Sequence, residues 1–203
     1  MTVGAEDAED GYILKLDRGL GVRRYRLSDA ESMAHHANNK NVAKFMRDRF
    51  PSPYTLEAGN FWIELCNSQK SMLQAGEWSS ETGASGPLTA LNYAITVNDE
   101  TVGSIGLEPG HDVYIRSAEL GYWIGEEHWG KGVMSTIVPA FVQWTWKTFG
   151  ILVRLNGEVG ELNKGSAALL GKAGFVVEGR RENAVFKNGK LESVIMFGAL
   201  RPT

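Results

Sequence analysis

Apolar and polar residues follow each other along the chain in patterns that predict short strands and helices. Near the N-terminus, residues 21–27 predict a strand, and two predicted helices follow, the first of them capped by Ser28 or Asp29. The segment PSPY at 51–54 ends the second helix, because proline lacks the N–H that a helix requires. Apolar residues then recur at helical spacing through 55–72 and predict a longer amphipathic helix.

The rest of the chain alternates between strand and helix patterns, after a loop rich in glycine and serine at 74–87. Strands are predicted at 88–98, 100–108, 118–125, 150–159, 175–186 and 190–200, and helices at 131–149 and 163–174. Pro139 lies inside the first of these helices and predicts a kink there. The order of elements, β-α-α and then β-β-β-α-β-α-β-β, is typical of an α/β (α+β) fold with a mixed sheet and helices on its faces.

The composition is that of one ordinary globular domain. The chain has 203 residues, a formal net charge of -3 and one cysteine, Cys66, which excludes an internal disulfide and a cysteine metal cluster. We expect an acidic, flexible tail at 1–12 and a single domain at 13–203. The sequence contains no basic run, no apolar run of transmembrane length and no leader pattern. It therefore predicts a cytoplasmic protein without nucleic-acid or membrane partners.

The stretch GYWIGEEHWGKGVMS at 121–135 has the order strand, turn, glycine loop and helix, which is typical of phosphate-binding sites. Gly125, Gly130 and Lys131 fit the nucleoside triphosphate pattern G-x-x-x-x-G-K-[ST]. Gly132, however, stands where that pattern requires a hydroxyl to hold magnesium, and no later strand contains an aspartate for the metal. The dinucleotide pattern G-x-G-x-x-G fails as well, because its third glycine is missing.

The helix after this loop has the charge distribution of an anion site. A helix N-terminus carries unpaired N–H groups and a partial positive charge. No acidic residue occurs between His128 and Gly157, Lys131 adds positive charge, and Gly130 and Gly132 leave room for an anion. A plain strand-to-helix turn with glycines at positive φ would explain the same residues, so the loop alone leaves both interpretations open.

Two motifs taken together decide between an anion site and a plain strand-to-helix turn. The first is Trp129-Gly130-Lys131-Gly132-Val133-Met134, and the second is a helix that begins at Asn163, contains Ser166 and ends at Gly174-Phe175. This pair resembles the GNAT superfamily of acyl-coenzyme A N-acyltransferases, most closely its RimJ/RimL branch. The family's pyrophosphate loop is [Q/R]-x-x-G-x-[G/A]; its central glycine is present here, and the departures at its two ends match the W-G-x-G form of that branch. The resemblance implies the GNAT fold, with a mixed sheet of about six to seven strands, helices on both faces and a splayed slot for acyl-CoA.

The resemblance also implies how acetyl-CoA, the expected co-substrate, would bind without a metal. Its pyrophosphate would lie on main-chain N–H groups from Trp129 to Ser135, and its pantetheine arm would run beside Tyr122–Ile124 like an added strand. An N–H group near Ile124 would polarise the thioester carbonyl. The residues implied to contact acetyl-CoA are Tyr122, Trp123, Ile124, Trp129, Gly130, Lys131, Gly132, Val133, Met134, Ser135, Asn163 and Ser166.

Acetyl transfer to an amine calls for a base, because a free alkylamine with a pKa of about 10.4 is protonated at neutral pH. The resemblance implies Glu158, on the strand beside the slot, and Glu119, at the start of the pantetheine strand; Glu182 is a third candidate. Each of them could instead be a solvated surface carboxylate, and some members of the family use no dedicated base. Leu170 occupies the position where many relatives have an acidic tyrosine, so Ser166 or water is the expected general acid. Ser166 could equally act as a capping residue.

The expected function is transfer of an acetyl group to a primary amine by direct attack on the thioester. The acceptor would be a protein N-terminus, a small amine or an amino acid, and the protein would be a monomer or a homodimer. The alternatives are a small-molecule-detoxifying acetyltransferase and a catalytically weak acyl-CoA-binding or sensing module. His35 and His36 are expected to be a surface pair, not a metal site. Of Trp144 and Trp146, one is expected in the core and one partly exposed.

Overall fold

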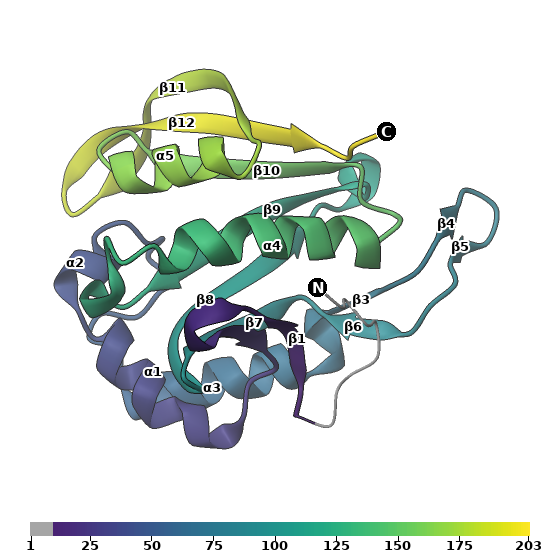
Figure 1. Ribbon diagram of the computed structural model, residues 1–203. Helices are drawn as coiled ribbons and strands as arrows, with labels where there is room; N and C mark the ends of the chain where they lie inside the picture. Colours follow the sequence, from purple (N-terminus) through teal and green to yellow (C-terminus); the bar gives the residue numbers. More distant parts are fainter. Residues whose placement is uncertain (1–9) are drawn as a thin grey trace.

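One large mixed sheet runs through the molecule in the computed structural model, which describes residues 10–203. Its eight strands lie in the order β1-β2-β7-β8-β9-β10-β12-β11 (Figure 1). Their bounds in that order are Tyr12–Lys15, Leu20–Arg23, Asn92–Val97, Glu100–Pro109, Ser117–Ile124, Arg154–Gly160, Lys190–Leu200 and Val176–Lys187. All neighbours are antiparallel except β9 and β10, which are parallel. The predicted mixed α/β architecture is confirmed.

Helices cover both faces of this sheet, as predicted. They are α1 (Ala30–Ala37), α2 (Lys40–Ala43), α3 (Leu56–Asn67), α4 (Val133–Thr148) and α5 (Lys164–Lys172). Short 3-10 turns occur at η1 (Asp17–Gly19), η2 (Leu27–Asp29), η3 (Gln69–Ser71), η4 (Asp112–Tyr114) and η5 (Glu126–His128). Helix α4 runs through Pro139 without interruption. Two small sheets, β3 (Met72–Gln74) with β6 (Leu88–Ala90) and β4 (Trp78–Ser79) with β5 (Gly83–Ala84), lie outside the main sheet, and the β4–β5 hairpin projects from the body (Figure 1).

Each face of the sheet has its own apolar core. On one face, α4 and α5 pack on alternate strand residues, and Phe141 and Leu170 are buried there. On the other face, α1 and α3 form a smaller cluster in which Met33 and Ile63 pack near Trp123 of β9. Because side chains alternate along a strand, Trp123 faces α1 and α3 while Tyr122 and its other neighbour Ile124 pack toward α4.

The structure corrects several expectations about single residues. The sheet has eight strands, not six to seven, because Tyr12–Lys15 forms a strand that the sequence pattern did not reveal. Most of the expected tail, residues 1–9, lies outside the described residues. Met72 belongs to β3 and not to the preceding helix, which ends at Asn67. Trp144 and Trp146 are both buried, because the last turn of α4 is enclosed by β7 on one side and by Arg201 on the other.

The expected helix cap at Asp29 is replaced by a buried ion pair. Asp29 makes no side-chain cap to α1. Its carboxylate instead accepts two bonds from the Arg23 guanidinium, at 2.7 and 2.8 Å, and one from the main-chain N–H of Arg26. Arg23 and Asp29 are only 1% and 5% exposed, so this pair joins β2 to the start of α1 inside the protein.

Candidate active site

The parallel strands β9 and β10 separate in the middle of the sheet. They pair over three positions only, the last of which joins Glu119 to Asn156. Beyond it β9 stays paired with β8 as far as Ile124, and β10 stays paired with β12 as far as Gly160. Strand main-chain groups that face the gap are thus free to pair with an extended ligand. The predicted splayed slot is confirmed.

The orientation of the β9 main chain fits the expected role of Ile124. The N–H of Gly125 donates to Val102 O on β8 at 2.9 Å. Since N–H groups alternate sides along a strand, that of Ile124 points away from β8 and toward the slot. The carbonyl of Ile124 accepts a hydrogen bond from Trp129 Nε1 at 2.9 Å, which holds the beginning of the glycine loop against the end of the strand.

The glycine loop opens helix α4 as the sequence predicts. Gly130 and Gly132 have φ values of +70° and +79°, which only glycine adopts without strain. Gly132 is the N-cap and offers no side chain, and the first intrahelical bond runs from Thr136 N to Gly132 O. The N–H groups of 133–135 precede this bond and therefore face the loop without a helical acceptor. Lys131 is exposed beside them.

Arg18 adds a positive charge that the sequence did not reveal. A Cβ placed on Gly132 would lie 3.6 Å from Arg18 Nη2, so the guanidinium lies next to the glycine loop. Arg18 belongs to η1, at the opposite end of the chain from the loop motif, and has a positive φ of 60°. No local pattern marks it, because its proximity depends on the pairing of β1 and β2. The loop thus gathers N–H groups, a lysine and an arginine, which together suit an anion.

Two of the three candidate bases lie together at the mouth of the slot. Glu119 and Glu158 lie on the face of the sheet that carries Trp123, and both contact Arg47. The Arg47 guanidinium donates to Glu119 at 2.5 Å and lies 3.7 Å from Glu158, whose other oxygen is 3.8 Å from Arg181. Arg47 comes from the segment after α2, so its role in joining the two carboxylates was not apparent in the sequence.

An open cavity of about 540 Å³ borders these carboxylates, and charged side chains make up most of its wall. The lining residues are Glu119, Arg154, Asn156, Glu158, Glu178, Gly179, Arg180, Arg181 and Met196. Glu182 is not among them; its side chain is 75% exposed and its nearest charged partner is Arg180, at 3.7 Å. The structure therefore brings Glu119 and Glu158 to one cavity and leaves Glu182 at the surface.

Two hydroxyl groups meet on the opposite face of the slot. Tyr122 OH and Ser166 Oγ are 2.8 Å apart, between β9 and the first turn of α5. Asn163 caps that helix, because its side-chain oxygen accepts the N–H of Ser166 at 3.1 Å. Burial raises the pKa of Tyr122 to about 12, so its phenol stays protonated at neutral pH. Ser166 thus bonds to a second hydroxyl, and its role as an acid stays a prediction.

Cys66 lies in the helical core, whereas His36 lies near the end of β9. Cys66 is 1% exposed in the core formed by α1 and α3, and burial raises the pKa of its thiol, so it is not a nucleophile in this environment. The expectation of a surface histidine pair is wrong for His36, which is 5% exposed because it packs under Gly125; His35 is exposed.

Comparison with known proteins identifies the family. The model of the acetyltransferase (GNAT) domain matches residues 20–176. The ribosomal-protein-serine acetyltransferase of Escherichia coli is 28% identical over 179 residues, which are 84% of this chain and 94% of that protein. RimL, a ribosomal L7/L12 α-N-protein acetyltransferase solved with coenzyme A, has a TM-score of 0.70 at 18% identity. The match covers 92% of this chain and 96% of the RimL chain. Spermidine N-acetyltransferase from Vibrio cholerae, solved with CoA and spermine, has a TM-score of 0.67 at 19% identity. The match covers 90% of this chain and 96% of the Vibrio cholerae chain.

The chain belongs to the GNAT acetyltransferase family. It is accordingly an acetyl-CoA-dependent N-acetyltransferase, and its relatives include the ribosomal-protein acetyltransferases of the RimJ/RimL type. The expectation of an enzyme is therefore confirmed over that of a binding module. In the part of the chain that the structure describes, none of the helices has the length and apolar character needed to cross a membrane.

Proposed function

We propose that this enzyme acetylates the N-terminal amine of a peptide or protein. The observation that carries the proposal is the open cavity at the mouth of the slot, whose wall contains three carboxylates and three guanidinium groups. A small apolar amine is best held in a closed apolar pocket, whereas an extended peptide needs an open groove and polar partners. The β4–β5 hairpin projects from the body (Figure 1), and the 74–87 segment contributes no residue to the wall of the cavity.

The relatives act on both kinds of acceptor. The E. coli relative is named for a serine of a ribosomal protein, and RimL for the α-amine of a ribosomal protein. The Vibrio cholerae enzyme is named for spermidine, a small polyamine. A polyamine would be attracted by Glu119, Glu158 and Glu178, but Arg154, Arg180 and Arg181 in the same wall oppose a multiply charged cation. A peptide supplies one ammonium together with carbonyl and carboxylate groups, which matches this mixed charge.

The arrangement of the carboxylates favours Glu158 as the base. Glu119 is hydrogen-bonded to Arg47 at 2.5 Å, which fixes its oxygens in an ion pair. Glu158 has guanidinium neighbours only at 3.7 and 3.8 Å, and its side chain is 24% exposed, so an oxygen is accessible to an incoming ammonium or to a bridging water. In this mechanism Glu158 removes the proton, the neutral amine attacks the thioester carbon, and the Ile124 N–H stabilises the oxyanion.

The hydroxyl pair supplies the proton for the leaving thiolate. The base and the hydroxyls lie on opposite faces of the sheet, so the amine enters from the side of Glu158 and the sulfur leaves on the side of Tyr122 and Ser166. When the tetrahedral intermediate collapses, the carbon–sulfur bond breaks and the sulfur takes a proton from the Ser166 hydroxyl. Either hydroxyl can donate across the Tyr122–Ser166 contact, and with Tyr122 as the donor its proton replaces the one that Ser166 gives up. Tyr122 and Ser166 would thus act as the general acid in place of the tyrosine that many relatives have at the position of Leu170.

The acceptor class is tested with peptides and amines offered side by side. Purified enzyme is given acetyl-CoA with a panel of peptides with free N-termini, the same peptides N-terminally blocked but containing lysine, and polyamines. Thiol release gives the rate, and mass spectrometry locates the acetyl group. We expect turnover with free N-termini and none with blocked peptides. Turnover with polyamines alone would show that the acceptor is a small amine and overturn the proposal.

Glu158→Gln is expected to lower kcat about a hundredfold or more, in line with the loss of one general base. The amide keeps the size of the side chain but accepts no proton, so the Kd for acetyl-CoA should not change. The measurement is kcat and KM at saturating acetyl-CoA from pH 6 to 10. Glu182→Gln is the matched control, since this glutamate is exposed and outside the cavity. A kcat for Glu158→Gln within threefold of the wild type would remove Glu158 from the mechanism.

Tyr122→Phe is expected to lower kcat about tenfold while the Kd for acetyl-CoA stays the same, because only the hydroxyl next to Ser166 is lost. Ser166→Ala should have at least as large an effect, since Ser166 is the group assigned to the sulfur. Tyr114→Phe serves as the control, because Tyr114 is 69% exposed on η4. Steady-state kinetics of all three variants provides the test. Unchanged kcat in both Tyr122→Phe and Ser166→Ala would mean that water protonates the thiolate.

A further inference from the structure

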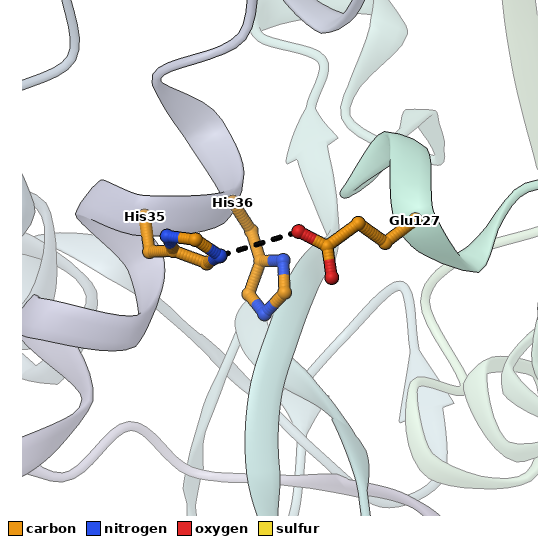
Figure 2. A group of neighbouring side chains, drawn as sticks. All are labelled: His35, His36 and Glu127. Carbon is orange, nitrogen blue, oxygen red and sulfur yellow. Dashed lines mark hydrogen bonds and ion pairs between the residues drawn. The ribbon is translucent and has the colours of Figure 1, made fainter.

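Three side chains that could bind a metal ion converge next to the glycine loop. His35 and His36 come from the last turn of α1, and Glu127 comes from η5 (Figure 2). Each offers one ligand atom, and these atoms all lie within 4.8 Å of one another. His35 Nε2 and Glu127 Oε1 are already 3.2 Å apart. Both of these side chains are 66% exposed, so each is free to adjust to a common ion.

The ring of His36 turns one of its nitrogens toward this cluster (Figure 2). Nδ1 of His36 is buried and has no hydrogen-bond partner among the described residues. It faces the turn that carries Glu127, because a Cβ on Gly125 would lie 2.7 Å from it, and Figure 2 shows one ring nitrogen on the side of Glu127. A buried polar atom without a partner destabilises the folded protein. A ligand to Nδ1 would remove that destabilisation.

The other ring nitrogen of His36 already has a hydrogen-bond partner. Nε2 of His36 lies 3.1 Å from a carboxylate oxygen of Glu100. A carboxylate has only acceptor oxygens, so in this contact the ring proton lies on Nε2. A neutral imidazole with its proton on Nε2 has its lone pair on Nδ1. A carboxylate behind a ligating histidine is the usual arrangement at metal sites.

We propose that His35, His36 and Glu127 form a site for a divalent transition-metal ion, with Zn²⁺ the best match. Two imidazoles and one carboxylate are a ligand set that zinc accepts, with nitrogen and oxygen ligands at about 2.0–2.2 Å and water in the fourth position. Magnesium and calcium prefer oxygen ligands only and are excluded by the two imidazoles. His128 lies nearby, with its ring centroid 5.2 Å from that of His36, and could replace the water as a fourth ligand.

The site would hold the glycine loop in place and would take no part in the chemistry. The ion would join α1 to η5, and η5 leads directly into Trp129 and the pyrophosphate loop. The proposed base and acid belong to β10 and α5, on other elements. Metal binding should therefore raise the stability of the folded protein and favour the loop conformation that accepts acetyl-CoA, while the transfer itself proceeds through protein groups alone.

Zinc binding to the intact protein tests this proposal. The protein is stripped with a chelator and dialysed, and Zn²⁺ is titrated in competition with a chromogenic chelator at pH 7.5. We expect one ion per chain in the wild type, and at least about a tenfold weaker Kd in His35→Ala and in Glu127→Gln, as is usual when a ligand is lost. Both side chains are exposed, so both variants should fold. Zn²⁺ should also raise the Tm of the wild type and not that of Glu127→Gln.

Two matched variants and one competing ion make the test decisive. His111→Ala and Glu57→Gln remove an exposed histidine and an exposed glutamate elsewhere and should bind Zn²⁺ like the wild type. A large excess of Mg²⁺ should not displace the zinc. The proposal is overturned if the wild type binds no Zn²⁺, or if His35→Ala and Glu127→Gln bind it as tightly as the two controls do.

Discussion

Gly132→Glu is expected to weaken acetyl-CoA binding by at least about a hundredfold, which corresponds to about 2.8 kcal/mol. Gly132 adopts a φ of +79° at the N-cap of α4, where any other residue is strained by about 1–3 kcal/mol. The carboxylate would also stand beside Arg18 and the N–H groups of the first turn, where the pyrophosphate is expected to bind. Isothermal titration calorimetry with acetyl-CoA measures the Kd of both proteins.

The turn between β11 and β12 offers a close control. Gly189 has a φ of +78°, and a Cβ there would meet nothing within 4 Å, so Gly189→Glu introduces the same charge and the same strain away from the loop. Its affinity for acetyl-CoA should equal that of the wild type. Gly132→Ala, which adds strain without charge, should bind with intermediate affinity. Retained binding in Gly132→Glu would mean that the pyrophosphate lies elsewhere.

Local patterns were sufficient to predict most of the fold. The apolar residues of 133–148 recur at helical spacing, and those of 92–97 and 102–107 form short buried runs bounded by turns, so their element types followed from the sequence alone. A helix from Asn163 to Gly174 was predicted as well, and the Asn163 cap and the positive φ of Gly174 are local features of its two ends. Strand β1 was missed because four residues in an acidic, glycine-flanked segment give too short an alternation to recognise.

The parts of the site that were missed depend on contacts between distant segments. Arg47 reaches Glu119 across 72 positions of the sequence, and Tyr122 reaches Ser166 across 44. Each of these residues has an ordinary local interpretation, on a surface helix or a strand, and only the separation of β9 from β10 brings them to one slot. The loop motif was found because glycine spacing and the absence of acidic residues are visible in the chain itself. The choice between Glu158 and Glu182 required the cavity.

Asp29→Asn is expected to destabilise the fold by about 3–5 kcal/mol at pH 7, because it removes the buried counter-charge of the Arg23 guanidinium. Arg23 is 1% exposed and donates twice to Asp29, while Asp99, its other acidic partner, has a side chain that is 53% exposed and is shared with Arg26. The loss should appear as a lower urea midpoint with an unchanged slope. Asp48→Asn removes the exposed partner of Lys187 and should leave the midpoint unchanged.

The pH dependence of this difference tests its electrostatic origin. Burial acts to raise the pKa of Asp29, but the hydrogen bonds from Arg23 and Arg26 outweigh it, and the pKa lies below the ordinary value of 3.8. A group whose pKa is lowered by folding stabilises the folded state fully above its unfolded pKa and loses that contribution as the pH falls through its folded pKa. The wild type and Asp29→Asn should therefore differ by a constant amount from pH 5 to 7 and converge as the pH falls below about 3.8. A difference that persists unchanged at pH 2.5 would mean that the substituted amide disturbs packing or hydrogen-bond geometry, and that the charge of Asp29 contributes little.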